Sequence, residues 1–183
     1  MLLYLNRIPE NEQNPFIDKL NKVAKFLDVP AIWLMQLFHQ ESSVNSAAVN
    51  SITGATGLIQ FMPSLLRDVY KLTPEEVKRM SATDQLDMVK RYLMPYKNSI
   101  DKYIDLYLAV FFPAAIGKPN TYTLETKNIS RATIARANPG YAKGKNFITV
   151  GDIETSIFQN IPMDYRHFFM GSKKKVALIP PLL

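Results

Sequence analysis

The sequence predicts a mostly α-helical protein, and three observations support this fold class. Apolar residues recur at steps of three and four along several segments, as they do on one face of a helix. Residues typical of helix starts stand in front of several of these segments. Strand-type alternation of apolar and polar residues is nearly absent. We therefore expect one helical domain over residues 1–172, followed by a basic and then apolar C-terminal tail over residues 173–183.

The first two helices are predicted from apolar spacing. One amphipathic helix starts with Pro15 at a first-turn position and ends near Asp28. A second helix starts near Pro30, and the poor helix formers Ser42 and Ser43 mark its end. The apolar stripe of the second helix consists of Leu34, Leu37, Phe38 and, unexpectedly, Glu41.

Capping signals predict the helices that follow. Residues 73–76, Thr-Pro-Glu-Glu, form a capping box, and Ser81 with Asp84 opens a helix that runs through about Tyr96. The nearly continuous apolar run over residues 100–112 predicts a buried central helix that is broken at Pro113.

The C-terminal part contains fewer helix signals. Turn formers accumulate between residues 120 and 145, and we expect an irregular connection there. Thr149 with Asp152 predicts a cap that leads a helix to about Asn160.

The composition excludes several chemistries. The chain has no cysteine, so disulfides, thiolate metal sites and a cysteine nucleophile are impossible. His39 and His167 are not in a metal-ligand spacing, and we expect neither a metal nor a cofactor. No secretory signal is visible at the N-terminus, and no apolar stretch approaches the ~20 residues that span a bilayer.

The net charge of +6 lies in the C-terminal third. Residues 127–175 contain nine Lys or Arg and three Asp or Glu, whereas the preceding residues are balanced. Such a region suits an anionic partner: a cell-wall polymer, nucleic acid or a membrane surface. Nucleic acid is the least supported partner, because the basic and aromatic residues show no common face.

Glu41 is the strongest candidate for a catalytic residue. Its spacing places a carboxylate on the apolar side of its helix, where removal from water favours the protonated form and raises the pKa. A general acid requires such a raised pKa. The alternative is that the stripe runs off the helix end, so that the carboxylate reaches solvent or caps Ser42 and Ser43.

The segment Gly54-Ala-Thr-Gly-Leu-Ile-Gln-Phe-Met-Pro63 supports a binding site near Glu41. Its two glycines permit positive φ and a close approach of the backbone to a ligand. Gln60 offers a donor and an acceptor to sugar hydroxyls, and Phe61 and Met62 offer apolar surface to a sugar face. The alternative is an ordinary loop followed by packing residues at a helix start.

Taken together, residues 39–45 (His-Gln-Glu-Ser-Ser-Val-Asn), 47–51 (Ala-Ala-Val-Asn-Ser) and 54–63 closely resemble the signature of soluble lytic transglycosylases. The resemblance covers about 25 residues and implies a lysozyme-like, mostly α fold. It also implies that Glu41 is the catalytic acid, that Ser42 is a positioning hydroxyl, and that Gln60 and Met62 belong to the substrate groove. Ile59 and Phe61 then alternate with them as packing residues.

One part of the chain departs from this family. The family usually carries an Ala-Tyr-Asn-Ala-Gly motif on a later helix, whereas Phe111 and Phe112 stand at or near its tyrosine and asparagine positions here. Tyr107 or Tyr141 are alternative sources of a hydroxyl, and Tyr107 is the more typical core residue. We include Tyr141 among the candidate substrate-binding residues, together with Ser42, Gln60, Phe61 and Met62.

The resemblance implies the activity of a peptidoglycan lytic transglycosylase. Such an enzyme cleaves the bond between N-acetylmuramic acid and N-acetylglucosamine and closes a 1,6-anhydro ring, with one glutamate as acid and base. Two alternatives stay open: a goose-type lysozyme-like hydrolase that uses water, and an inactive wall-binding or virion structural module. The partners are then peptidoglycan glycan strands and, through the basic third, anionic wall polymers. A wall-degrading motif without a visible signal favours a bacteriophage protein, or one delivered to the wall by a secretion machine.

Overall fold

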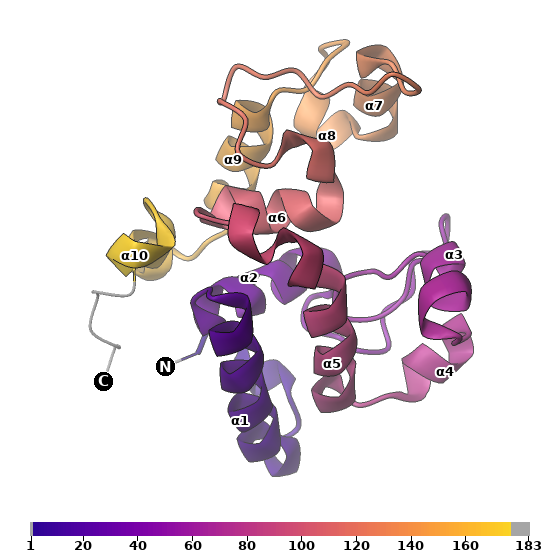
Figure 1. The fold of residues 1–183 in the computed structure, drawn as a ribbon, viewed down its shortest axis with the longest axis vertical. Coiled ribbons are helices and arrows are strands. Elements are labelled where there is room, and N and C mark those ends of the chain that lie inside the picture. Colours follow the sequence, from indigo (N-terminus) through magenta and orange to yellow (C-terminus); the bar gives the residue numbers. More distant parts are fainter. Residues whose placement is uncertain (1, 177–183) are drawn as a thin grey trace. The chain divides into compact units, whose positions relative to one another are not determined.

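Helices form nearly all of the regular structure in the computed structural model, which describes residues 2–176 (Figure 1). In this described part, β-structure is limited to isolated bridges such as that between Thr56 and Phe61. The predicted mostly α fold class is therefore confirmed. None of the helices in the described chain has the length and apolar character that crossing a membrane requires.

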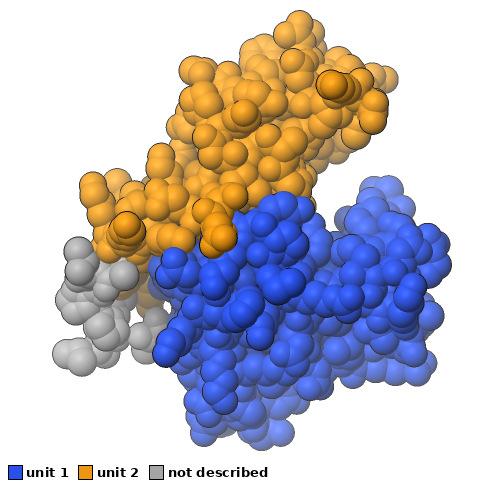
Figure 2. Space-filling view, in the orientation of Figure 1, with its two compact units in different colours: residues 1–97, 180–183 blue, residues 98–179 orange. Residues whose placement is uncertain are grey.

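The chain divides into two compact units, which Figure 2 shows in different colours. The first unit comprises residues 1–97 and 180–183, and the second comprises residues 98–179. The expected single domain over residues 1–172 stays a prediction, since the two units are described separately below.

The described residues of the first unit form five α-helices and shorter helical turns. Its elements are η1 (Leu5–Arg7), α1 (Glu10–Leu27), α2 (Ala31–Ser42), α3 (Pro63–Leu65), η2 (Leu66–Tyr70), α4 (Pro74–Arg79) and α5 (Ala82–Leu93). A 3₁₀ segment, η3 (Met94–Ser99), crosses the boundary between the units.

Helix α1 starts earlier than the sequence predicts. It begins at Glu10, so Pro15 lies inside the helix and not in its first turn. The prediction was wrong because Pro15 and Asn11 are both exposed: water can hydrogen-bond the Asn11 carbonyl that the missing proline N–H leaves unpaired. The predicted end is confirmed, since Asp28 adopts a left-handed conformation directly after Leu27.

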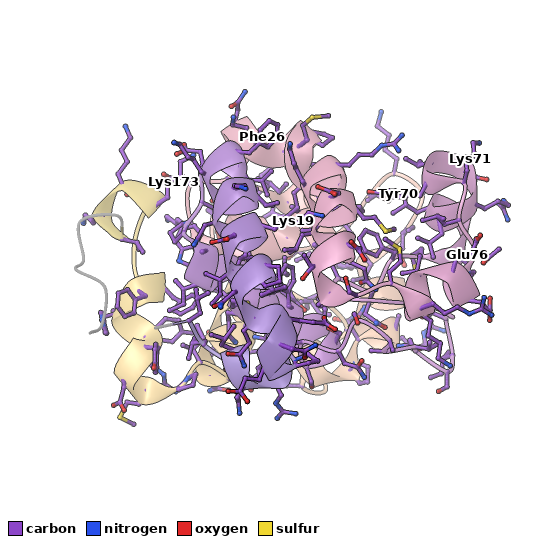
Figure 3. The ribbon with its side chains drawn as sticks, turned by 90° about the horizontal axis from the view of Figure 1, so that it is seen from below. Lys19, Phe26, Tyr70, Lys71, Glu76 and Lys173 are labelled. Carbon is purple, nitrogen blue, oxygen red and sulfur yellow. The ribbon has the colours of Figure 1, made fainter. Side chains whose placement is uncertain are left out.

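Helices α1 and α5 lie side by side in the first unit (Figure 3). Lys19 forms an ion pair with Asp87 at 2.7 Å, and the ammonium of Lys90 stands 4.2 Å from the centre of the Phe26 ring. These two helices and α2 contribute fully buried side chains to the core of the unit: Phe16, Leu20, Trp33, Leu34, Phe38, Leu86 and Val89.

The predicted caps of α4 and α5 are confirmed. The Thr73 hydroxyl accepts a hydrogen bond from the Glu76 backbone, and the Glu76 carboxylate accepts one from the Thr73 backbone. The Ser81 side chain accepts from the Asp84 backbone, although α5 itself ends at Leu93 and gives way to the 3₁₀ segment η3 before Tyr96.

The second unit is built on α6 (Tyr103–Phe111), which starts three residues later than expected and ends before Pro113 as expected. The buried Asp105 fixes its start, because the carboxylate accepts hydrogen bonds from the backbone of Asp101, Lys102 and Gly117. The other elements are η4 (Pro113–Ala115), α7 (Arg131–Ala137), α8 (Pro139–Ala142), α9 (Val150–Gln159), η5 (Met163–Phe169) and α10 (Lys173–Val176).

The irregular connection expected between residues 120 and 145 contains two short helices. Ser130 caps α7 by accepting a hydrogen bond from Thr133, and α8 starts with Pro139 at its first position. These starts obey the ordinary capping rules, but each helix is too short to show an apolar period.

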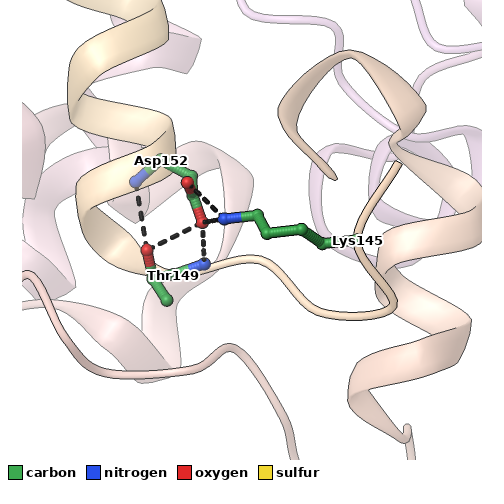
Figure 4. A network of polar contacts seen from close by, with 3 residues as sticks. All are labelled: Lys145, Thr149 and Asp152. Atoms are coloured by element: carbon green, nitrogen blue, oxygen red, sulfur yellow. Dashed lines mark hydrogen bonds and ion pairs between the residues drawn. The ribbon is translucent and has the colours of Figure 1, made fainter. Parts of the chain in front are cut away.

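Helix α9 confirms the predicted cap at Thr149. The Asp152 carboxylate accepts hydrogen bonds from the Thr149 backbone at 2.8 Å and from Lys145 Nζ at 2.6 Å (Figure 4). Burial acts to raise the pKa of Asp152, but these hydrogen bonds outweigh it and lower that pKa below its usual value.

The predicted C-terminal tail is described only in part. Its first residues form α10, and the Lys173 backbone donates a hydrogen bond to the Asp101 carbonyl at 2.7 Å. Residues 177–183 of the predicted tail lie outside the described residues.

Candidate active site

Glu41 lies in the last turn of α2, directly before the chain changes direction. Helix α2 ends at Ser42, and Ser43 and Val44 both have positive φ, of 55° and 60°. A β-branched residue such as Val44 rarely adopts this conformation, which costs about 1–3 kcal/mol. The Val44 side chain is only 2% exposed, so its burial helps to offset that cost.

The Glu41 carboxylate is half-buried and unpaired. It forms no hydrogen bond and no ion pair with any residue of the described chain, so it does not cap Ser42 or Ser43. Burial raises the pKa of Glu41 to about 7. A carboxyl group with this pKa can donate a proton and later accept one near neutral pH.

Ser42 links the end of α2 to the glycine-rich segment. Its hydroxyl lies 3.0 Å from the Phe38 carbonyl oxygen and 3.1 Å from the Leu58 carbonyl oxygen, and these two acceptors share its single proton. The side chain is nearly buried. In the structure, Ser42 therefore positions the segment that follows Gly57.

The glycine-rich segment forms a tight turn over residues 57–60. The backbone of Thr56 and Phe61 pair on either side of it, at 3.0 and 2.9 Å. Gly54 and Gly57 have φ of +71° and +86°, as the sequence predicts for both glycines. The group that approaches Gly57 closely, however, is a side chain of the protein and not a ligand. A Cβ at Gly57 would lie 2.5 Å from Gln85 Oε1.

The turn presents two of the predicted binding residues and buries a third. Gln60 is half-exposed, and its amide nitrogen donates to the carbonyls of Gly57 and Ala48. Met62 is 47% exposed and available to a ligand, whereas Phe61 is 1% exposed and packs against the rings of Tyr70 and Tyr92.

Gln85 holds this turn in place, although it was not among the residues predicted for the site. Its side chain is fully buried; Oε1 accepts from the Leu58 backbone, and Nε2 donates to the carbonyls of Ser46 and Val77. The sequence contained one signal for this role, since Gln85 is a polar residue at a core position of an amphipathic helix.

Tyr92 is a second residue beside Glu41 that was not among the residues predicted for the site. It is half-buried on α5, with its ring 6.1 Å from that of Phe61. The pKa of Tyr92 is raised, and burial is the largest cause. The neighbouring Tyr96 and the Glu41 carboxylate raise it by smaller amounts. The phenol therefore lies close enough to Glu41 to interact electrostatically with it.

Tyr141 belongs to the second unit. Its hydroxyl shares a hydrogen bond with the Tyr107 hydroxyl, and its ring meets the Phe111 ring edge-on at 5.2 Å. Phe111 also stacks on Tyr107 at 5.9 Å. Phe111, at one position of the family departure, is thus part of an aromatic cluster with Tyr107 and Tyr141, and Phe112 beside it is half-buried.

His39 has a structural role beside this site. Its ring stacks on Tyr4 with 3.8 Å between ring centres, and burial and the charge of Arg7 lower its pKa. Within the described part of the chain, no group of three His, Cys, Asp or Glu residues could hold a metal ion.

A model of the Transglycosylase SLT domain family matches residues 20–112, which is more than half of the chain. This chain is a member of the transglycosylase SLT family. The family has a lysozyme-like, all-α fold, and membership implies a lytic transglycosylase-like function with peptidoglycan as substrate. The matched range contains Glu41, the 54–63 segment and Tyr92, whereas Tyr141 lies outside it. No curated protein and no solved structure matches the chain.

Proposed function

We propose that this SLT protein cleaves the β-1,4 bond between N-acetylmuramic acid and N-acetylglucosamine and forms 1,6-anhydromuramic ends. Glu41 is its single acid and base. The observation that carries this proposal is the unpaired, half-buried Glu41 carboxylate, whose pKa burial raises to about 7. The family match supports the reaction class, because residues 20–112 include this glutamate.

The proposed reaction begins with protonated Glu41. It donates its proton to the glycosidic oxygen, the C1–O bond breaks, and N-acetylglucosamine leaves with a free 4-hydroxyl. The acetamido oxygen of the muramic acid stabilises the positive charge at C1. The Glu41 carboxylate then removes the proton of the muramic 6-hydroxyl, whose oxygen bonds to C1 and closes the anhydro ring. No water is consumed, and Glu41 is protonated again.

The other residues predicted for the site have different roles in this reaction. We propose that Met62 and the free side of the Gln60 amide contact the glycan, because both are accessible beside the turn. Ser42 and Phe61 act on substrate binding indirectly, through the backbone of the turn and through the Tyr92 ring. Tyr141 is kept as a proposed glycan contact.

Product analysis tests this reaction against hydrolysis. Purified sacculi are digested with the protein, and the released muropeptides are analysed by mass spectrometry. The proposal predicts anhydro ends, which are lighter than reducing ends by one water. Reducing ends alone would instead identify a goose-type lysozyme-like hydrolase.

An inactive wall-binding module is the second candidate, and the replacement of the family motif by Phe111 and Phe112 favours it. Such a module would sediment with sacculi without releasing any muropeptide. The same digest therefore distinguishes all three functions.

A further inference from the structure

A row of aromatic rings begins at the buried Phe61 and continues along α5 into η3. The ring centres of Phe61 and Tyr92 lie 6.1 Å apart, and those of Tyr92 and Tyr96 lie 6.5 Å apart. Tyr96 stands four residues after Tyr92, and η3 continues directly from α5, which accounts for the contact between the two rings. Both tyrosines are half-buried, so each presents part of its side chain to solvent. We call them the Tyr92–Tyr96 pair.

The hydroxyls of the Tyr92–Tyr96 pair have no partner in the described part of the protein. Neither forms a hydrogen bond with any described residue, and neither oxygen is among the fully buried polar atoms that lack a partner, so both reach solvent. The third tyrosine near Phe61 differs, because the Tyr70 hydroxyl donates to the Met88 carbonyl at 2.9 Å. Two phenol hydroxyls are therefore available to a ligand, whereas that of Tyr70 is used inside the protein.

The two phenols of the pair have different relations to Glu41. Tyr92 interacts electrostatically with the Glu41 carboxylate, whereas no such interaction joins the described residues Tyr96 and Glu41. Tyr96 interacts with Tyr92 instead, so it lies beside the proposed acid without acting on it directly. We therefore expect Tyr92 to affect the proton transfer and Tyr96 to affect what binds next to it.

A half-exposed phenol matches the surface of a sugar. A pyranose ring has an apolar face of C–H groups and a polar rim, and a tyrosine side chain offers an apolar ring and a hydroxyl that both donates and accepts. Phe111 and Phe112, which stand at or near the tyrosine and asparagine positions of the family motif, carry no hydrogen-bonding side-chain group. In this chain, the accessible phenol hydroxyls of the first unit come from α5 and η3 instead.

We propose that Tyr96 is a substrate-binding residue that contacts the glycan next to the bond cleaved at Glu41, with its ring against a sugar face and its hydroxyl on the polar rim. The inference rests on the proposed function, because it takes the glycan as the substrate of this site. Loss of the Tyr96 hydroxyl then changes the affinity for the glycan and not the proton transfer at Glu41.

Kinetics on soluble glycan strands test this division of roles. Tyr96→Phe should raise KM about fivefold and leave kcat unchanged, because one neutral hydrogen bond to the substrate is lost. The matched control is Met94→Ala, which should change neither constant. Met94 is an exposed residue of the same 3₁₀ segment, and it lies two residues from each tyrosine, so it does not share their side.

The split between KM and kcat separates substrate binding from a structural role. A merely structural Tyr96 would lower the melting temperature of Tyr96→Phe or change KM and kcat together. Either result would overturn the proposal, as would a lower kcat at unchanged KM or two unchanged constants. Each of these outcomes would leave the proposed function intact.

A binding measurement tests Tyr96 independently of turnover. A tetrasaccharide of alternating N-acetylglucosamine and N-acetylmuramic acid is titrated into the Glu41→Gln protein by calorimetry. Adding Tyr96→Phe should weaken binding about fivefold, and adding Met94→Ala should not. Equal affinity after Tyr96→Phe, or no binding of the tetrasaccharide, would reject Tyr96 as a glycan contact. If the wild type cleaved no glycan, the proposed function would fail, and this titration would still decide the role of Tyr96.

Discussion

At the scale of single residues, the site depends on a carboxylate that the fold makes difficult to ionise. Glu41 forms no ion pair and no hydrogen bond with any described residue, and it is largely removed from water. An ionised Glu41 therefore destabilises the folded protein, and this cost accompanies the catalytic use that we propose for the residue.

The first prediction concerns the stability of Glu41→Gln. The pKa of Glu41 is raised from 4.5 to about 7, so between these pH values the folded protein binds more protons than the unfolded chain. Wild-type stability should therefore fall as pH rises through this window. The free energy of unfolding of Glu41→Gln should exceed that of the wild type by about 3 kcal/mol at pH 8 and equal it at pH 4. Urea denaturation at several pH values measures the difference, and a difference independent of pH would contradict the raised pKa.

The second prediction concerns Tyr92. Removing its hydroxyl takes away a group that lies near the Glu41 carboxylate and can donate to it once its proton has been transferred. Tyr92→Phe should lower kcat about tenfold, with little change in KM or in the melting temperature. Tyr122→Phe, which removes a tyrosine hydroxyl in the second unit, serves as the control. An unchanged kcat in Tyr92→Phe would exclude Tyr92 from the reaction.

At the scale of elements, the end of α2 and the turn over residues 57–60 are held together by buried polar groups. Ser42 connects the helix to Leu58, and Gln85 connects the turn to Ser46 and Val77. Each contact satisfies a backbone group that would otherwise be buried without a partner. The position of Glu41 relative to the turn is thus defined by side chains of α2 and α5.

The third prediction tests this arrangement at Gly57. An alanine there would have an unfavourable positive φ and would collide with Gln85 Oε1. Gly57→Ala should destabilise the protein by about 3 kcal/mol and reduce activity even below its melting temperature. Gly140→Ala is the control, because its Cβ would meet open space and its φ is not positive, so its stability should barely change. Equal stabilities of the two variants would contradict this account of the turn.

The elements also show what could be predicted from the sequence. The caps at Thr73, Ser81 and Thr149 and the end of α2 were predicted correctly, because capping depends on neighbouring residues alone. The roles of Gln85 and Tyr92 were missed, because they depend on contacts across more than 25 residues of sequence. Glu41 was predicted as a candidate because local spacing places it on the apolar stripe.

At the scale of the whole molecule, the excess positive charge and the proposed catalytic residue lie in different units. Glu41 belongs to the first unit, and residues 127–175, which carry the excess of Lys and Arg, belong to the second. We propose that the second unit adds affinity for anionic wall polymers to an active site that lies in the first.

The fourth prediction tests that division. Replacing Arg131 and Arg136, both exposed on α7, with glutamine should weaken binding to sacculi that carry anionic polymers, and the effect should diminish at high salt. Binding to sacculi stripped of these polymers should not change. The double variant Lys22→Gln and Lys25→Gln removes the same charge from α1 and should bind like the wild type. Equal weakening by both pairs would show that only net charge matters.

The central claim is that Glu41 is the single acid and base of a lytic transglycosylase, and its substitution tests that claim most directly. Glu41→Gln keeps the size of the side chain and removes its titratable proton, so the fold should be retained. Sacculi incubated with this variant should release no anhydromuropeptides, whereas the wild type releases them under the same conditions. Undiminished release by a folded Glu41→Gln protein would contradict the assignment.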